Sequence, residues 1–490
     1  MLTKTDFIQY LNCPESLWLA KNKSKVFDKY KGKFSLFLEK LIKEGYEVEE
    51  YAKRLFPLGI ELPENSSPEY TSQQLLTNNN IFFQPSFVTD NNEFARVDIL
   101  EKLNNDTFHL YEIKSTTSVK KEKLEDACFQ KYVLNECGYK VSKISIIHLN
   151  KEYIKNGDIV PEELIEIIDV TDQIGDIYSS TVSKIKAASN FINEKTINEN
   201  ECSCRYKTRS NHCDTFKYFN KDVPEFSIYE IERISSSKIS QLVDSNQLSI
   251  LDIPLNFVLN PKQKAQVESV RQMEALVNSD NIHGVLSNLK FPLHFIDYET
   301  YASAIPKADG ISPHKHLVFQ VSIHTLNENN EIKHFEWIGD RIELPTDMIH
   351  KMESFTGHTG TFISWYAPFE KSRNNDMIQW LPEFKSYLDF INNNMFDLMS
   401  IFKEDYIDYR FHGSASIKKV LPVLCPQFSY DNLEVQDGTM ALDTWGRMVT
   451  ESNSTIDIEQ TKLNLLEYCK LDTLAMVEIY NKLNLVEHNE

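Results

Sequence analysis

The sequence predicts an α/β protein of two or three domains. Its 490 residues exceed what one hydrophobic core usually supports, because a domain commonly takes roughly 100–200 residues. A hydrophobic content of 41%, with 11% aromatic residues, is sufficient to build such cores. Short apolar segments alternate with segments that have apolar residues at helical spacing, which indicates sheets covered by helices.

The N-terminal domain, residues 1–221, is predicted to begin with helices and to continue as a sheet. Apolar residues stand at helical spacing between Leu2 and Phe56. Three short apolar segments separated by Asn and Asp clusters then predict a β-meander, over Ile81–Val88, Phe94–Leu100 and Thr107–Ile113. A helix from about Lys121 to Glu136 and a strand over Lys143–Leu149 follow.

Residues 222–288 are predicted to form a helical connector, and residues 289–490 a second α/β domain. The predicted strands of this domain are Leu293–Asp297, Leu317–Leu326, Ile332–Trp337 and Thr361–Trp365. A helix is expected near Met348–Phe355, and further helices extend to the end of the chain. Consecutive strands followed by alternating helix and strand predict a mixed sheet flanked by helices.

Charge and hydropathy narrow the class of protein. The formal net charge of -20 argues against a protein that coats nucleic acid through its overall field, yet a nuclease needs carboxylates to hold metal ions. The stretch from Lys21 to Lys33 mixes lysines with aromatic residues, which suits phosphates and bases, although an ordinary solvated segment reads the same way. No stretch approaches the roughly 20 apolar residues of a membrane span, and the start lacks a secretory pattern. We therefore expect a soluble, cytoplasmic protein without structural disulfides or membrane partners.

Two carboxylates and a lysine stand at strand ends in the N-terminal domain. Asp98 lies near the end of one predicted strand, and Glu112-Ile113-Lys114 closes the next. Carboxylate oxygens are the ligands that Mg²⁺ and Mn²⁺ prefer, and a lysine beside the metal can help to deprotonate the attacking water. Alternatively, these residues are ordinary charged side chains exposed to solvent at strand ends and form no catalytic site.

These residues resemble the RecB-like branch of the PD-(D/E)xK nucleases. Asp98 and Glu112-x-Lys114 are similar to the catalytic core of that group, and Gln130 with Tyr132 looks like its final helix motif. The opening Leu2-Thr3-Lys4-Thr5-Asp6-Phe7, continuing to Cys13-Pro14, resembles the N-terminal helix and cysteine of the same group. Glu49, four residues after Gly45, resembles an upstream metal ligand of these nucleases.

Four cysteines form a candidate metal centre. Cys202, Cys204 and Cys213 cluster in the sequence, and Cys13 precedes a proline near the start of the chain. Four thiolates can saturate one centre, and the resemblance implies a 4Fe–4S cluster, with Zn²⁺ or unbound thiols as alternatives. Cys128, Cys137, Cys425 and Cys469 are expected to be core residues.

The C-terminal domain carries a second set of acidic residues. Asp297 and Glu299 are two apart in a predicted strand, so their side chains point to the same face. Tyr468 and Asp472 are four apart in a predicted helix and share one face of it. The order Asp-x-Glu followed by Tyr-x-x-x-Asp resembles the DEDD exonucleases on the RNase H-like fold, which implies that Tyr468 positions water.

The second motif of those exonucleases is matched less closely. Phe369-Glu370 follows the predicted strand Thr361–Trp365, but Glu replaces the usual Asp, and Tyr366 stands where the family has Asn. Asp397 resembles the residue that begins the following helix, as a cap or as a support behind the metal ligands. Ser414–Leu421 resembles the Ser-Leu-Lys segment of such exonucleases.

Taken together, the chain resembles a bacterial family of unknown function that fuses an iron–sulfur RecB-like nuclease domain to an RNase H-like exonuclease domain. This implies an enzyme that hydrolyses phosphodiester bonds in DNA with Mg²⁺ or Mn²⁺, and that removes nucleotides from 3′ ends. RNA is the alternative substrate. A nucleic-acid-binding scaffold with one or both sites inactive and a zinc-stapled RNA-processing enzyme are the other interpretations.

Overall fold

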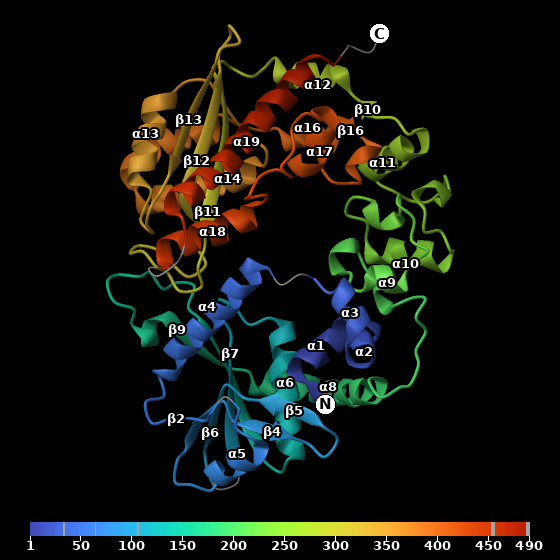
Figure 1. The fold of residues 1–490 in the computed structure, drawn as a ribbon, viewed down its shortest axis with the longest axis vertical. Helices are drawn as coiled ribbons and strands as arrows, with labels where there is room; N and C mark the ends of the chain where they lie inside the picture. Colours follow the sequence, from blue (N-terminus) through green and yellow to red (C-terminus); the bar gives the residue numbers. More distant parts are fainter. Residues whose placement is uncertain (33–34, 64, 105–106, 452–455, 487–490) are drawn as a thin grey trace. The chain divides into compact units, whose positions relative to one another are not determined.

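The structure is a computed structural model that describes residues 1–490 except 33–34, 64, 105–106, 452–455 and 487–490 (Figure 1). It divides into two compact units. Unit 1 comprises Met1–Val223 with Ala304–Pro306 and Ser312–His314, and unit 2 comprises Pro224–Ser303, Lys307–Ile311 and Lys315–Glu490. Within the described parts, no helix has the length and apolarity needed to span a membrane.

Unit 1 contains two sheets and the helices that cover them. Its elements are β1 (Leu2–Thr3), α1 (Lys4–Asn12), α2 (Pro14–Asn22), α3 (Ser24–Tyr30), α4 (Leu36–Lys53), β2 (Ile60–Glu61), α5 (Pro68–Leu75), β3 (Ile81–Phe83), β4 (Ser86–Val88), β5 (Glu93–Arg96), β6 (Ile99–Lys102), β7 (Thr107–Ile113), α6 (Lys121–Glu136), β8 (Lys140–Leu149), α7 (Pro161–Leu164), β9 (Ile165–Asp169), α8 (Thr171–Phe191) and α9 (Phe216–Phe219). The larger sheet has the order β2-β3-β6-β7-β8-β9, and the smaller one the order β1-β5-β4.

The larger sheet of unit 1 is covered on both faces. Alternate residues of β7 and β8, such as Leu110 and Ile144, pack in one core cluster with residues of α1, α6 and α8. The intervening residues, such as Tyr111 and Ile147, pack in a second cluster with Val48 of α4. This alternation follows from the two-residue period of a strand. It places Glu112, which shares the parity of Leu110, on the α6 face.

The predicted meander is wrong in one respect, because two of its three strands are interrupted. Ile81–Val88 is broken between β3 and β4 at Gln84, which has a φ of 57° and precedes Pro85. Phe94–Leu100 is broken between β5 and β6 at the facing position, where the Gln84 amide donates to the Asp98 carbonyl. Proline cannot donate to a strand ladder, so the pairing changes there and β4 and β5 leave the larger sheet.

Unit 2 is built on a five-stranded mixed sheet. Its elements are α10 (Ser236–Asp244), α11 (Pro261–Gln272), β10 (Leu276–Val277), α12 (Ser279–Leu286), β11 (Leu293–Tyr301), β12 (Leu317–Leu326), β13 (Ile332–Ile338), α13 (Thr346–Thr356), β14 (Thr361–Ser364), α14 (Ala367–Trp380), α15 (Lys385–Asn393), β15 (Met395–Asp397), α16 (Met399–Glu404), β16 (Tyr406–Ile407), α17 (Ile417–Leu424), α18 (Gly438–Thr450) and α19 (Ile458–Asn484). The order β13-β12-β11-β14-β15 has antiparallel pairs from β13 to β11 and parallel pairs from β11 to β15.

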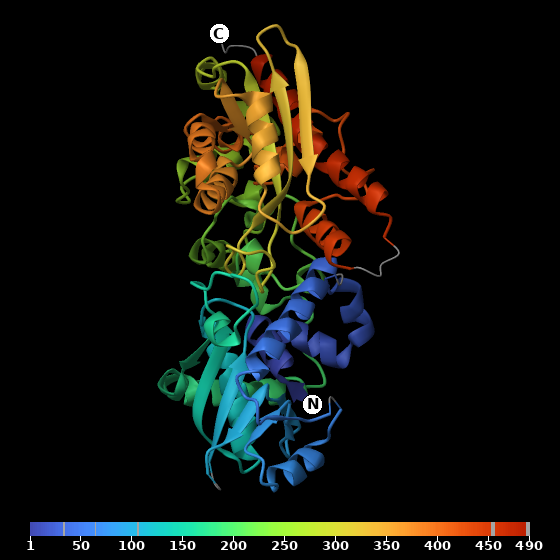
Figure 2. The same cartoon turned by 90° about the vertical axis from the view of Figure 1, so that its left-hand side faces the viewer.

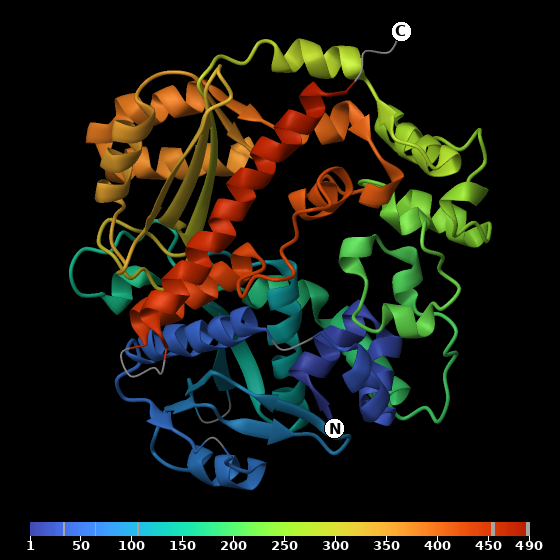
Figure 3. The same ribbon diagram turned by 45° about the horizontal axis from the view of Figure 1, so that its top comes forward.

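Helices cover both faces of this sheet, as the sequence predicted. Phe295 of β11 packs in a core cluster with residues of α18 and α19, whereas Ile296 packs with residues of α13, α14 and α15. The two helical layers lie on opposite sides of the strands in Figure 2, and Figure 3 shows α19 running across them. Asp297 and Glu299 share the parity of Phe295 and therefore lie on the α19 face.

Several predicted elements differ from the observed ones. The segment predicted to be wholly helical from Leu2 begins with β1, and the C-terminal region predicted to hold only helices after Trp365 contains β15 and β16. By contrast, the predicted helix over Lys121–Glu136 and strand over Leu317–Leu326 have the observed bounds. Residues 222–288 contain α10, α11 and α12 and belong to unit 2 from Pro224 onward.

Candidate metal and catalytic sites

Three carboxylates of unit 2 converge from distant parts of the sequence. Asp297 and Glu299 project from the central strand β11, and Asp472 projects from α19, which packs on the same face. One carboxylate oxygen from each residue lies within 4.8 Å of the others. Glu299 and Asp472 are buried, and Asp297 is half-buried. The arrangement offers three hard oxygen ligands to a divalent cation.

The electrostatics of this cluster favour a bound cation. Burial raises the pKa of Asp297 well above its usual value, and the charges of Asp472 and Glu299 raise it further. Burial and the neighbouring acids also raise the pKa of Glu299. The pKa of Asp472 is raised by burial to about 6, although hydrogen bonds from Tyr430 and Tyr468 oppose this. Like charges this close repel one another unless a cation or protons neutralise them.

Glu370 lies beside the three-carboxylate group but outside it. It is buried in the first turn of α14, where Ser364 donates a hydrogen bond of 2.6 Å to its Oε2. Burial raises its pKa to about 7 against that hydrogen bond, and its charge contributes to the raised pKa of Asp297. Tyr366, the residue that replaces the expected Asn, is 47% exposed.

Asp397 does not begin a helix. It is the last residue of β15, and α16 is preceded by Leu398 at its N-cap without a side-chain cap hydrogen bond. Burial raises the pKa of Asp397, while hydrogen bonds with the backbone of Met399 and Ser400, the first two residues of α16, lower it. The capping role considered from the sequence stays a prediction. Asp397 is close enough to raise the pKa of Glu370, which fits a supporting position behind that residue.

Three residues around the unit 2 carboxylates were not assigned from the sequence. The Tyr430 hydroxyl donates a 2.5 Å hydrogen bond to Asp472. The Lys418 ammonium lies 5.7 Å from the centre of the Tyr430 ring, and its charge lowers the pKa values of Glu299 and Asp472. Cys469, expected to be a plain core residue, has its sulfur 3.5 Å from Asp297 Oδ2. The position of Cys469, three residues before Asp472 on one helix face, was the signal available for it.

Acidic and basic side chains of unit 1 meet around Glu112. The Glu112 side chain is buried in β7, and its Oε1 accepts hydrogen bonds from Lys4 at 2.5 Å and from Lys114 at 2.6 Å. Gln130 of α6 donates to the other oxygen of the carboxylate. Asp98 lies at the break between β5 and β6, where its Oδ2 accepts the Ile113 amide at 2.7 Å.

The charges of this cluster stabilise one another. Burial disfavours the ionised form of Glu112, but Lys4 and Lys114 outweigh that effect and hold its pKa below the usual range. Burial and the Glu112 charge raise the pKa of Asp98 to about 7, although Lys4 opposes this. Lys114 also bonds Asp126 at 2.6 Å, and the two carboxylates outweigh burial and raise its pKa.

Tyr132 and Glu49, both predicted for this site, make their described contacts with other residues. Tyr132 packs in the apolar core of unit 1 and lies two residues after Gln130 on α6, so its side chain points away from Glu112. Glu49 of α4 bonds Lys53 at 3.0 Å and Gln84 at 2.7 Å. Like Asp98 and Glu112, it lies outside the groups of three or more close metal-ligating atoms found among the described residues.

Lys4 and Asp126 are members of the cluster that the sequence did not single out. Lys4 belongs to the quoted N-terminal motif but received no role, and Asp126 stands four residues before Gln130 on α6. Because residues four apart share one helix face, this spacing could have indicated from the sequence that Asp126 lies beside Gln130. For Lys4 the separation from Glu112 is 108 residues, so only the fold could join them.

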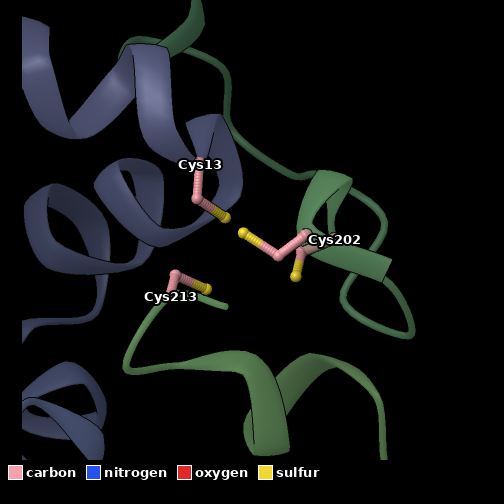
Figure 4. Close-up of side chains that lie close together, drawn as sticks. Cys13, Cys202 and Cys213 are labelled. Carbon is pink, nitrogen blue, oxygen red and sulfur yellow. The ribbon is translucent and has the colours of Figure 1, made fainter. Parts of the chain in front are cut away.

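Four cysteines of unit 1 form a compact group. The sulfur atoms of Cys13, Cys202, Cys204 and Cys213 all lie within 4.8 Å of one another, and all four thiols are free. Figure 4 shows the sulfurs of the three labelled cysteines turned toward a common point. Cys13 joins α1 to α2, while Cys202 and Cys204 begin a short 3-10 helix. Asn220 donates a hydrogen bond of 3.3 Å to the Cys202 sulfur.

The lysines of the stretch from Lys21 to Lys33 engage acidic side chains of the chain itself. Lys21 bonds Asp6 at 2.6 Å, and Lys23 bonds Glu199 at the same distance. Lys33 lies outside the described residues. Lys31 also bonds Asp28 at 2.7 Å, and these three internal ion pairs weaken the argument for a basic nucleic-acid surface there.

Comparison with known proteins gives relatives without an assigned activity. A family model described as "Domain of unknown function (DUF2779)" matches residues 294–416. The chain is similar to the uncharacterized protein MG366 homolog of Mycoplasma pneumoniae, with 26% identity over 40% of this chain, and to the uncharacterized protein MG366 of Mycoplasma genitalium, with 24% over 39%. The uncharacterized protein UU173 of Ureaplasma parvum is 25% identical over 40% of the chain. The alignments cover 32%, 32% and 31% of the length of these relatives, about a third of each.

Proposed function

We propose that the chain is a metal-dependent nuclease that hydrolyses phosphodiester bonds in DNA, with one site in each unit. The observation that carries the proposal is the convergence of Asp297, Glu299 and Asp472 within 4.8 Å, from a strand and a helix about 170 residues apart. Buried acids that raise one another's pKa values are costly to maintain without a cation to neutralise them. Clusters of this kind are typical of functional sites.

For unit 2 we propose an RNase H-like exonuclease fold of the DEDD type. The mixed sheet, with β11 at its centre and α19 across one face, supports this assignment because it presents the matched motifs together. Glu370, which lies beside the group, would serve as the fourth acid after a shift away from Ser364.

The unit 2 carboxylates fit a pair of Mg²⁺ or Mn²⁺ ions. When bound, such ions activate water and stabilise the leaving oxygen of a phosphodiester. Asp297, Glu299 and Asp472 would hold them, with Glu370 completing the set. The Tyr468 hydroxyl, buried beside Asp472, would orient the attacking water, while Tyr430 fixes the Asp472 carboxylate through its 2.5 Å hydrogen bond. A 3′ terminal phosphodiester is the substrate that this motif order favours.

For unit 1 we propose a RecB-like nuclease site. Asp98 and Glu112 would hold a divalent ion, which supplies Lewis-acid chemistry to the scissile phosphate. Lys114, anchored by Asp126 at 2.6 Å, would orient the attacking water as an ammonium and stabilise the negative charge that develops on it. Gln130 fixes the Glu112 carboxylate from α6.

The four cysteines would hold a structural metal centre that ties the start of unit 1 to its end. The resemblance implies a 4Fe–4S cluster. A tetrahedral zinc site has Zn–S bonds of about 2.3 Å, which sets its sulfurs about 3.8 Å apart, within the observed limit of 4.8 Å. A 4Fe–4S cluster binds each thiolate through a different iron and spaces the sulfurs more widely, so the four side chains would have to move apart to hold it. Iron content and visible absorption of anaerobically purified protein distinguish the two.

The test is a nuclease assay on labelled single- and double-stranded DNA and RNA, with Mg²⁺, Mn²⁺ or EDTA. We compare wild type, Lys114→Ala, Asp297→Ala and the double variant. We expect metal-dependent cleavage that each single variant reduces and the double variant abolishes. No cleavage of any substrate by folded wild-type protein with either metal would overturn the proposal.

A second candidate is a nucleic-acid-binding role for unit 2 without catalysis. Glu370 favours it, because this acid is bonded to Ser364 and stands outside the group of three carboxylates. In that case the Asp297→Ala protein would cleave nucleic acid at the wild-type rate, whereas the Lys114→Ala protein would show no cleavage.

A further inference from the structure

Lys4, the first residue of α1, lies at the acidic cluster of unit 1 although the nuclease motifs give it no role. Its ammonium group is 2.5 Å from Glu112 Oε1, the same oxygen that Lys114 bonds at 2.6 Å. The Lys4 side chain is 28% exposed, whereas that of Glu112 is 1% exposed. Lys4 is therefore the more solvent-accessible partner of this ion pair.

The fold holds Lys4 at this place from several directions. Thr3 and Asp6 form a capping box at the start of α1, and the preceding β1 pairs with β5 beside the Asp98 break. Phe7 stacks on Phe129 of α6, with 5.4 Å between ring centres, next to Gln130. These contacts fix the backbone at the start of α1 and with it the position of Lys4.

Formal charges suggest why the cluster contains two lysines. Asp98, Glu112 and Asp126 with Lys4 and Lys114 leave one net negative charge when all are ionised. A divalent cation would change this to one net positive charge, which matches one phosphodiester group. Without Lys4 the loaded site would be neutral and would have no net attraction for phosphate.

Lys114 and Lys4 would be left with different hydrogen-bond partners once Glu112 binds a metal ion. Lys114 keeps Asp126 at 2.6 Å, whereas the hydrogen bond described for Lys4 is the one to Glu112. A cation on Glu112 would repel both ammonium groups. Lys4 is then the donor that needs a new anionic partner, and its side chain is partly exposed to solvent.

We propose that Lys4 is a phosphate-binding residue of unit 1, which donates to a nonbridging oxygen of the scissile phosphodiester when Glu112 holds a divalent ion. This inference rests on the proposed nuclease function of unit 1. It adds a substrate contact that comes from the helix ending at Cys13, so the cysteine centre would also steady this contact.

The test measures binding of the full chain to a single-stranded oligonucleotide by fluorescence anisotropy. It uses Ca²⁺ in place of Mg²⁺, over a series of salt concentrations. All proteins carry Asp297→Ala, which removes metal-dependent binding by unit 2. We compare Lys4→Met and Lys4→Arg with Lys40→Met, a control that removes another 2.5 Å ion pair to a buried glutamate, Glu44.

We expect Lys4→Met to weaken binding about tenfold and to lower the slope of log affinity against log salt by about 0.7, as loss of one phosphate contact does for a single strand. Lys4→Arg should restore both values, and Lys40→Met should change neither. If Lys4→Met does not fold, the affinity and the salt slope are measured on Lys4→Gln instead, whose side-chain amide can still donate to Glu112.

A wild-type slope in folded Lys4→Met or Lys4→Gln would overturn the inference and leave Lys4 with a structural role. If the Asp297→Ala protein shows no metal-dependent binding, and if Lys114→Ala does not reduce wild-type cleavage, then both the role of Lys4 and the proposed function of unit 1 are wrong. Cleavage that depends on Lys114, together with an unchanged slope, removes only the role of Lys4.

Discussion

At the scale of single residues, the unit 2 carboxylates link metal binding to pH. Their pKa values lie above those of exposed acids in an unfolded chain, with Asp472 at about 6 and Asp297 and Glu299 also raised. A raised carboxyl pKa contributes stability at low pH that is lost as pH rises through the folded value. Without a divalent ion, unit 2 should therefore become less stable from about pH 4 to about pH 7.

Mg²⁺ should reverse this loss. We expect it to raise the melting temperature by several degrees at pH 7.5, since a ligand at about a hundredfold excess over Kd adds about 2.7 kcal/mol, and by much less at pH 5. Thermal unfolding in an Asp98→Ala background measures the effect. Asp297→Asn with Glu299→Gln is the control that should show little response, and an equal Mg²⁺ effect at both pH values would contradict the prediction.

Tyr468 should matter less than a metal ligand. A hydroxyl that orients water contributes roughly 10²–10⁴-fold, whereas loss of a ligand can empty a metal position. We expect Tyr468→Phe to reduce 3′ cleavage within that range and to retain Mg²⁺ binding, while Asp297→Ala loses both. Single-turnover cleavage and calorimetric Mg²⁺ titration, each in a Lys114→Ala background, measure the difference. Equal loss of metal binding in the two variants would show that Tyr468 acts on the ligands.

At the scale of elements, the cysteine group joins segments that no sheet connects. Cys13 lies between α1 and α2, and the other three cysteines lie nearly 200 residues later. Closing so long a loop with a metal restricts the unfolded chain, and thiolate sites also contribute their binding energy to folding. α1 begins at Lys4, in the acidic cluster, and its C-cap is Cys13, in the cysteine group.

We expect Cys204→Ser to abolish the brown colour of anaerobic protein and to lower the free energy of unfolding of unit 1 by several kcal/mol. Cys137→Ser is the matched control, because Cys137 is a half-buried thiol outside the group. Visible absorption, iron and zinc analysis, and thermal unfolding are the measurements. Stoichiometric zinc without iron would identify the alternative metal. Unchanged stability after Cys204→Ser would contradict a structural role.

At the scale of the whole molecule, the division into two units indicates which fragment of the chain should fold and be active without the rest. Ile282 and Leu286 of α12 belong to the same core cluster as Phe295 and α19. A fragment that begins at Ser287 would lose these side chains, so a fragment from Pro224 follows the unit better.

We expect residues 224–490 to shorten a 5′-labelled oligonucleotide from its 3′ end with Mg²⁺ or Mn²⁺, and we expect Asp297→Ala to stop this. A time course resolved on a gel should show shrinking ladders. Immediate release of the labelled mononucleotide would indicate the opposite polarity. If the fragment folds but forms no cleavage products, unit 2 would bind nucleic acid without catalysis.

The sequence by itself determined those features that depend on neighbours along the chain. The helix over Lys121–Glu136 and the strand over Leu317–Leu326 follow from local periodicity and have the observed bounds. The shared face of Asp297 and Glu299 follows from the two-residue repeat of a strand. Local spacing fixes which side chains share a face, whatever the rest of the fold.

Only the tertiary structure decided which faces meet. Lys4 joins Glu112 across 108 residues, and Tyr430 joins Asp472 across 42, through contacts that no local pattern encodes. Pro85 marks the break at Gln84 in the sequence, whereas the break at Asp98 depends on pairing with that segment, since Phe94–Leu100 contains no proline or glycine. Periodicity describes one element at a time, whereas the partners of a buried charge are set by the packing of several elements at once.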